Sequence, residues 1–226
     1  VNVMYVAGTN EGFSAVTGRS GERFLGIAMS RFEVRASGIE IDNRVFFING
    51  AAFRSDPEQD RQRTIAHELT HLLLSDSTMP YTPAWVSEGA AMYASDDFPL
   101  ETITRWYREQ GPDTVDLATL SSQTSFGGHA GATVEQTSIE YAYSAFLANY
   151  LIETYGNDRF FEFYDSFADV PVDELRAQLE TDTGFEAAMS AFAPQVADQK
   201  MQAIYGIDLA TLERNYEAWL ADQLDA

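Results

Sequence analysis

The sequence predicts an α+β protein in which a small twisted β-sheet near the N-terminus is followed by a largely helical remainder. Short runs rich in β-branched and aromatic residues lie within the first fifty positions, separated by Gly-rich and polar turns. Beyond residue 56, apolar residues recur at helical spacing and strand signals become scarce. We therefore expect a single domain, with an N-terminal lobe over residues 1–78 and a helical C-terminal lobe over residues 79–226.

The expected sheet is built from three short strands. They cover Val3–Ala7, Phe24–Met29 and Val45–Asn49. The turn-forming segment TGRSG at residues 17–21 separates the first two. The three runs are too short and too close together to predict more than one small sheet.

Helices are expected to make up the rest of the chain. The first should run from Asp56 to about Ser75, because Asp56 is a good N-cap residue, Pro57 suits the first helical position and Glu58 lies in the first turn. Further helices are expected at about residues 84–94, 100–110, 138–155, 158–168, 173–181, 185–204 and 209–220. Residues 121–133 are rich in Ser, Thr and Gly without periodicity, which predicts a loop.

Composition excludes several kinds of partner. The chain has 35 acidic and 14 basic residues, a net charge of −21, whereas binding to nucleic acid or to an anionic membrane surface needs a basic face. Its apolar runs are far shorter than the roughly 20 residues that cross a bilayer, so no membrane span is expected. Without cysteine, a metal site would have to be built from histidines and carboxylates.

The first long helix contains the sequence His-Glu-Leu-Thr-His at residues 67–71. Successive residues of an α-helix are rotated by about 100°, so His67 and His71 lie only about 40° apart on one face. Two imidazoles one turn apart can bind the same zinc ion, and Glu68 beside them can take a proton from the water that the metal activates. The motif therefore predicts a zinc site with a general base, although two histidines can also belong to a polar patch without metal.

A catalytic zinc ion takes three protein ligands and leaves a fourth position for water. The candidate third ligand is Glu88, within the sequence WVSEGAAMY at residues 85–93. The small residues 89–91 that follow it would let this helix pack closely against the HELTH helix. Taken alone, a glutamate in a first helical turn is explained by its interaction with the helix dipole. Its pairing with the upstream motif favours metal ligation.

With Glu88 placed 17 residues after His71, the two motifs together resemble the gluzincin zinc metallopeptidases of the peptidase MA-like group. The resemblance implies a zincin-like fold, Zn²⁺ as the cofactor and hydrolysis of peptide or protein substrates. It also implies that His67, His71 and Glu88 bind the zinc ion and that Glu68 is the general base. By the same resemblance we expect an extracellular or cell-envelope location, with any export signal removed or outside this sequence.

Two tyrosines and one histidine remain as candidates. Residues 139–147, IEYAYSAFL, resemble the helix that presents a transition-state tyrosine in the aminopeptidase branch, which implies Tyr141 as the oxyanion donor. The alternative is that Tyr141 is a second buried aromatic residue. Tyr143 lies on an apolar stripe at helical spacing and is expected in the core. His129 is either a surface loop residue or a residue close to the transition state.

The resemblance also bears on substrate binding. It implies that the strand over Val45–Asn49 is a sheet edge along which an extended peptide pairs. The aminopeptidase branch grips the substrate amine with a Gly-x-Met-Glu-Asn segment, and no such segment precedes His67, so exopeptidase action is in doubt. The leading function is zinc-dependent peptide hydrolysis. The alternatives are a zinc-binding but noncatalytic interaction module and a pseudoenzyme without metal.

Overall fold

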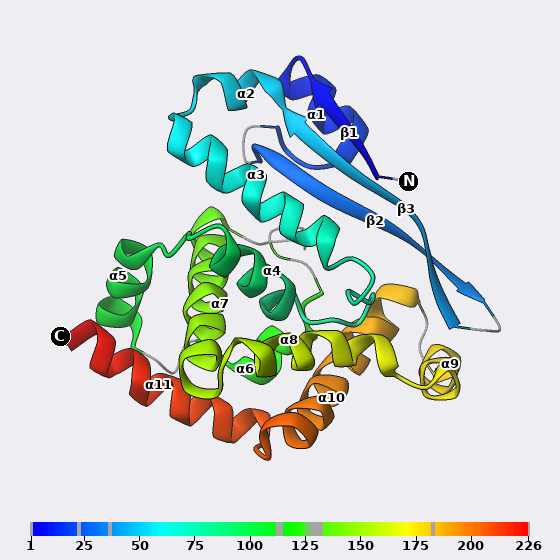
Figure 1. Cartoon of the computed structure of the whole chain (residues 1–226), viewed down its shortest axis with the longest axis vertical. Helices are drawn as coiled ribbons and strands as arrows, with labels where there is room; N and C mark the ends of the chain where they lie inside the picture. Colours follow the sequence, from blue (N-terminus) through cyan, green and yellow to red (C-terminus); the bar gives the residue numbers. More distant parts are fainter. Residues whose placement is uncertain are drawn as a thin grey trace. The chain divides into compact units, whose positions relative to one another are not determined.

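The structure is a computed structural model that describes residues 2–21, 24–35, 38–111, 115–124, 126, 133–181 and 184–225. Its elements confirm the predicted α+β class (Figure 1). The chain divides into two compact units, the first formed by Val1–Asp76 with Ala94–Asp97 and the second by Ser77–Tyr93 with Phe98–Ala226. The prediction of one domain with two lobes stays a prediction.

The first unit combines a small sheet with three helices. Its described elements are β1 (Asn2–Ala7), α1 (Asn10–Thr17), β2 (Gly26–Arg35), β3 (Gly38–Asn49), α2 (Gly50–Ser55) and α3 (Glu58–Leu73). The strand order is β1-β3-β2, so β3 is central, parallel to β1 and antiparallel to β2. All three predicted strands are present, whereas α1 and α2 were not predicted.

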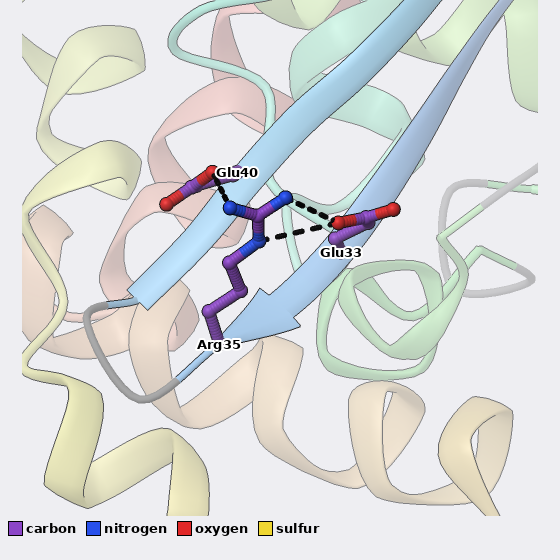
Figure 2. A network of polar contacts seen from close by, with 3 residues as sticks. All are labelled: Glu33, Arg35 and Glu40. Carbon is purple, nitrogen blue, oxygen red and sulfur yellow. Dashed lines mark hydrogen bonds and ion pairs between the residues drawn. The ribbon is translucent and has the colours of Figure 1, made fainter.

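The β2–β3 hairpin is longer than predicted, and in its distal part, residues 31–35 and 39–42, apolar residues alternate with charged ones. Figure 2 shows Arg35 between Glu33 and Glu40, with guanidinium-to-carboxylate distances of 2.7 and 2.9 Å. Arg35 also holds the pKa of Glu33 below its usual value, through a hydrogen bond and through its charge. These exposed opposite charges on paired strands support the register, although such pairs contribute little stability. The alternation of apolar and charged residues in this segment is typical of a strand, although it lies beyond the predicted strands.

The start of α3 differs from the prediction. Asp56 is not its N-cap, because residues 50–55 form α2 and Asp56 follows that helix in an extended conformation. Pro57 is the N-cap of α3, with ψ at 149°, and makes no side-chain capping bond. The helix therefore begins at Glu58, one residue later than the sequence pattern suggested.

Helix α3 lies beside β2 in the first unit (Figure 1). Phe46 and Ile48 of β3 are buried on the sheet. The close approach depends on Gly26 of β2, where a Cβ atom would lie 3.0 Å from the Phe46 ring and 3.2 Å from Cγ of Glu68. The sheet thus supports the helix that carries the HELTH motif.

The second unit is helical throughout its described part. Its elements are α4 (Ala84–Ala94), α5 (Leu100–Gln110), α6 (Leu117–Ser122), α7 (Val134–Tyr155), α8 (Asn157–Asp165), the short 3₁₀-helix η2 (Ser166–Asp169), α9 (Val172–Thr181), α10 (Phe185–Tyr205) and α11 (Leu209–Asp225). Every predicted helix is present. Helix α7 begins one turn earlier than predicted because Thr133 and Gln136 form a capping box. Helix α6 occupies the start of the predicted loop, and residues 125 and 127–132 lie outside the described residues.

Helix α7 forms the centre of the second unit and packs with α5, α8 and α11 (Figure 1). The predicted core stripe is confirmed by the burial of Ile139, Tyr143, Phe146, Leu147, Tyr150 and Leu151. The ring of Tyr143 lies edge-on to that of Tyr216 on α11, with centroids 4.8 Å apart. None of the described helices is both long enough and apolar enough to cross a bilayer.

Candidate metal centre

His67 and His71 converge on one face of α3. Their Nε2 atoms are 3.1 Å apart, and the two rings meet edge-to-face with centroids separated by 4.8 Å. Both side chains are partly exposed. The one-turn spacing predicted from the sequence therefore brings the two imidazole nitrogens to the same point.

This spacing fits two ligands of a tetrahedral zinc ion. With Zn–N bonds of 2.0–2.1 Å, two tetrahedral nitrogen ligands lie about 3.3 Å apart. The observed 3.1 Å between the Nε2 atoms is close to that value. In a chain without cysteine, imidazole is also the ligand type best suited to zinc. The distance between the two nitrogens therefore matches that between two ligands of one zinc ion.

Glu68 lies next to the pair but points to the sheet. Its side chain is only 8% exposed, and its Oε2 atom accepts a hydrogen bond of 2.5 Å from the backbone N–H of Ala28 on β2. A charge-assisted bond of this kind compensates part of the cost of burying a carboxylate. Glu68 is therefore a buried carboxylate that β2 holds in place.

Glu88 belongs to the second unit, on α4, and is partly exposed. The close contacts of the neighbouring Gly89 are with α7, where an added Cβ would lie 2.6 Å from the carbonyl oxygen of Ser144 and 3.1 Å from the Cβ of Ala148. The sequence assigned this glycine to packing against the HELTH helix. The contacts that exclude a side chain at this position are instead those between α4 and α7.

Helix α4 is anchored in the second unit by its first residues. The indole N–H of Trp85 donates a 2.9 Å hydrogen bond to the hydroxyl of Ser121, and its ring stacks on Phe163. The backbone N–H of Ala84 donates to the carbonyl of Gln123 at 2.7 Å. Most residues of α4 are buried as well, so the helix that carries Glu88 has a well-defined place within its unit.

A buried tyrosine lies within electrostatic reach of Glu88. Burial raises the pKa of Tyr164 on α8, and the negative charge of Glu88 acts in the same direction. The Tyr164 hydroxyl shares a 2.6 Å hydrogen bond with that of Thr78. Tyr164 was not predicted from the sequence, because it lies among apolar residues in a helix whose pattern indicates only a core position.

The remaining candidates differ in how the structure places them. Tyr143 is 1% exposed, which confirms its predicted place in the core. Tyr141, on α7, is partly exposed and its ring lies edge-on to Phe126 at 5.3 Å. Its predicted role as an oxyanion donor stays a prediction. His129 lies outside the described residues.

The predicted substrate-binding edge is wrong. Residues 45–49 belong to β3, which pairs with β1 on one side and with β2 on the other and so has no edge to offer. The edge strands of the described sheet are β1 and β2, and β2 is the one beside α3. The order of the strands is not contained in the local pattern of any one strand, so the sequence could not place β3 in the centre. The backbone amide of Ala28 as the partner of Glu68 was likewise not predicted.

Comparison with known proteins identifies the family. The family model of the peptidase MA superfamily matches residues 26–193, which is more than half of the chain. The chain therefore belongs to the peptidase MA superfamily. The matched segment starts at the first residue of β2 and includes α3, α4 and α7. No curated protein and no solved structure matches the chain.

Proposed function

We propose that this protein is a zinc metallopeptidase of the gluzincin type, in which His67, His71 and Glu88 bind the zinc ion and Glu68 is the general base. The observation that carries the proposal is the convergence of the two Nε2 atoms to 3.1 Å on the HELTH helix of a peptidase superfamily member. Two imidazoles and one carboxylate are by their chemistry a ligand combination that catalytic zinc takes. Three protein ligands would leave the fourth tetrahedral position for water.

When bound, zinc in such a site makes a water molecule more acidic and polarises the carbonyl of a peptide bond. Glu68 accepts the proton of the attacking water and passes it to the nitrogen of the leaving amine, so that it acts first as a base and then as an acid. Tyr141 is proposed to donate a hydrogen bond to the oxyanion that forms at the carbonyl carbon. The substrates are therefore peptides or proteins.

The proposal is tested by separating metal binding from catalysis. Glu68→Gln should keep one zinc ion per chain, measured by elemental analysis, while losing chelator-sensitive cleavage of an unbiased peptide library. Glu88→Ala should lose zinc as well as activity. Glu135→Gln, the same substitution at an exposed position in the first turn of α7, serves as the matched control. Undiminished cleavage by Glu68→Gln would refute the role of Glu68.

The same measurements distinguish the noncatalytic alternative. A protein that binds one zinc ion per chain but cleaves no peptide in a diverse library would be a zinc-binding interaction module. A protein that binds no zinc would be a pseudoenzyme. Under our proposal, both zinc binding and cleavage should be present in the native chain and both should be abolished by a chelator.

A further inference from the structure

The backbone amide that holds Glu68 belongs to the outer side of an edge strand. Ala28 is paired with Phe46, while Leu25 accepts the backbone hydrogen bond of Asn49 on β3. Because hydrogen-bonded and non-hydrogen-bonded pairs alternate in an antiparallel ladder, Ala28 occupies a non-hydrogen-bonded pair and directs its N–H away from β3. In an ordinary edge strand this N–H would face solvent. Here it donates to Oε2 of Glu68 at 2.5 Å.

The geometry around this bond restricts the glutamate further. A Cβ atom on Gly26 would lie 3.2 Å from Cγ of Glu68 and 3.3 Å from the methyl carbon of Thr64. The glycine therefore lets the Glu68 side chain lie against β2, two residues before the amide that holds its carboxylate. The side chain of Glu68 is only 8% exposed, which leaves it few other rotamers.

We propose that the backbone amide of Ala28 is a positioning group for the general base, and that Gly26 provides the space this arrangement needs. The strand fixes one carboxylate oxygen of Glu68 and thereby sets where the carboxylate lies for proton transfer. Freezing the side chain before substrate arrives removes an orientational cost from the proton-transfer step. The catalytic consequence rests on the function proposed above, whereas the hydrogen bond is a feature of the fold that can be measured on its own.

The first experiment measures that bond in the metal-free protein. Amide hydrogen exchange of ¹⁵N-alanine-labelled protein, with Ala28 assigned from the signal missing in Ala28→Ser, should show a protected Ala28 N–H. Glu68→Met, which keeps the length of the side chain but has no oxygen acceptor, should speed its exchange by about tenfold or more. Glu68→Gln retains an acceptor oxygen and should preserve most of the protection. Equal exchange in the native protein and Glu68→Met would overturn the proposal.

The second experiment deletes only the donor. Replacing Ala28 by lactic acid through nonsense suppression changes its N–H to an ester oxygen and keeps the methyl side chain, and alanine inserted by the same method is the control. We expect one zinc ion per chain, an unchanged KM and a kcat lower by about tenfold or more. An amide-to-ester replacement at Ser30 with glyceric acid, which keeps the serine side chain, measures the general effect of losing an amide on the same outer side of β2.

These outcomes separate the two proposals. An equal loss of kcat at positions 28 and 30, or full kcat in the Ala28 ester, would overturn the positioning role while the metallopeptidase remained active. A native chain that binds no zinc or cleaves no peptide would instead refute the proposed function. The exchange measurement would then still decide whether Ala28 holds Glu68.

Discussion

Gly89 lies directly after the proposed zinc ligand Glu88. The structure predicts that a larger residue at this position destabilises the fold. On this helix an added Cβ would lie 2.6 Å from the carbonyl oxygen of Ser144, whereas ordinary contacts begin at 3.4 Å. Gly89→Ala therefore requires α4 and α7 to separate by roughly 0.8 Å at this point, or requires an equivalent distortion of one of them. Because backbone forms one side of the contact, no side-chain rotation relieves it.

Two opposing effects set the size of the change. Replacing an interior helical glycine by alanine gains about 1 kcal/mol in helix propensity. Overpacking a well-packed core costs about 1–3 kcal/mol, and contact with backbone belongs to the upper part of that range. We expect Gly89→Ala to lose about 1–2 kcal/mol, or a fall in Tm of roughly 2–8 °C for a chain of this size. Gly89→Val adds two methyl groups at the same place and should lose more.

The assay is thermal and urea unfolding followed by circular dichroism. Gly8→Ala is the matched control, since Gly8 has no positive φ and nothing lies within 4 Å of its added Cβ. That variant should change stability by no more than about 0.5 kcal/mol. If Gly89→Ala were as stable as the native protein or more so, helix propensity would have prevailed, and the close α4–α7 contact would be refuted.

Three other predictions concern stability. The side chain of Asp116 caps α6 through the amides of residues 118 and 119, and a hydrogen bond from Thr119 lowers its pKa, so Asp116→Ala should cost about 1 kcal/mol at pH 7 in urea unfolding. Because the folded pKa is the lower one, this difference should shrink as the pH falls below about 4, and a constant difference down to pH 2 would contradict the capping role. The buried hydroxyl of Tyr143 has no hydrogen-bond partner among the described residues, so Tyr143→Phe should be neutral or more stable by about 1 kcal/mol, and a clear loss of stability would show a missed partner. Burial raises the pKa of Tyr143 and Tyr216, which keeps their folded forms neutral, so stability should decline as the pH rises above about 10, detectable as tyrosinate absorbance that appears only on unfolding.

Local patterns were sufficient for most of the helices. The spacing of apolar residues predicted α4 and α5 with the observed bounds, and it predicted the buried stripe of α7 that includes Tyr143. Helices α1, α2 and α6, with eight residues or fewer, have too few turns for a periodic pattern to stand out. The distal end of the β2–β3 hairpin was not predicted, although its apolar and charged residues alternate as in a strand.

The candidate site shows the same division. The convergence of His67 and His71 follows from helix geometry, since residues four apart always share a face. This part of the site could be predicted from the HELTH motif alone. The identity of the edge strands could not be predicted from the sequence, because it depends on which strands pair with each side of β3. The hydrogen bond from Ala28 to Glu68 joins residues 40 positions apart, and no local pattern announces a backbone donor.

The sequence by itself determined that this chain has an α+β fold and a helix presenting two imidazoles and a carboxylate in the HELTH pattern. Those features depend on hydrophobic periodicity and on the fixed rotation per helical residue, which are properties of short segments. Only the tertiary structure decided that β2 is the edge beside this helix, that Ala28 holds Glu68, and that Gly89 is required by α7. Each of these is a contact between segments distant in sequence, and packing of the whole unit selects it.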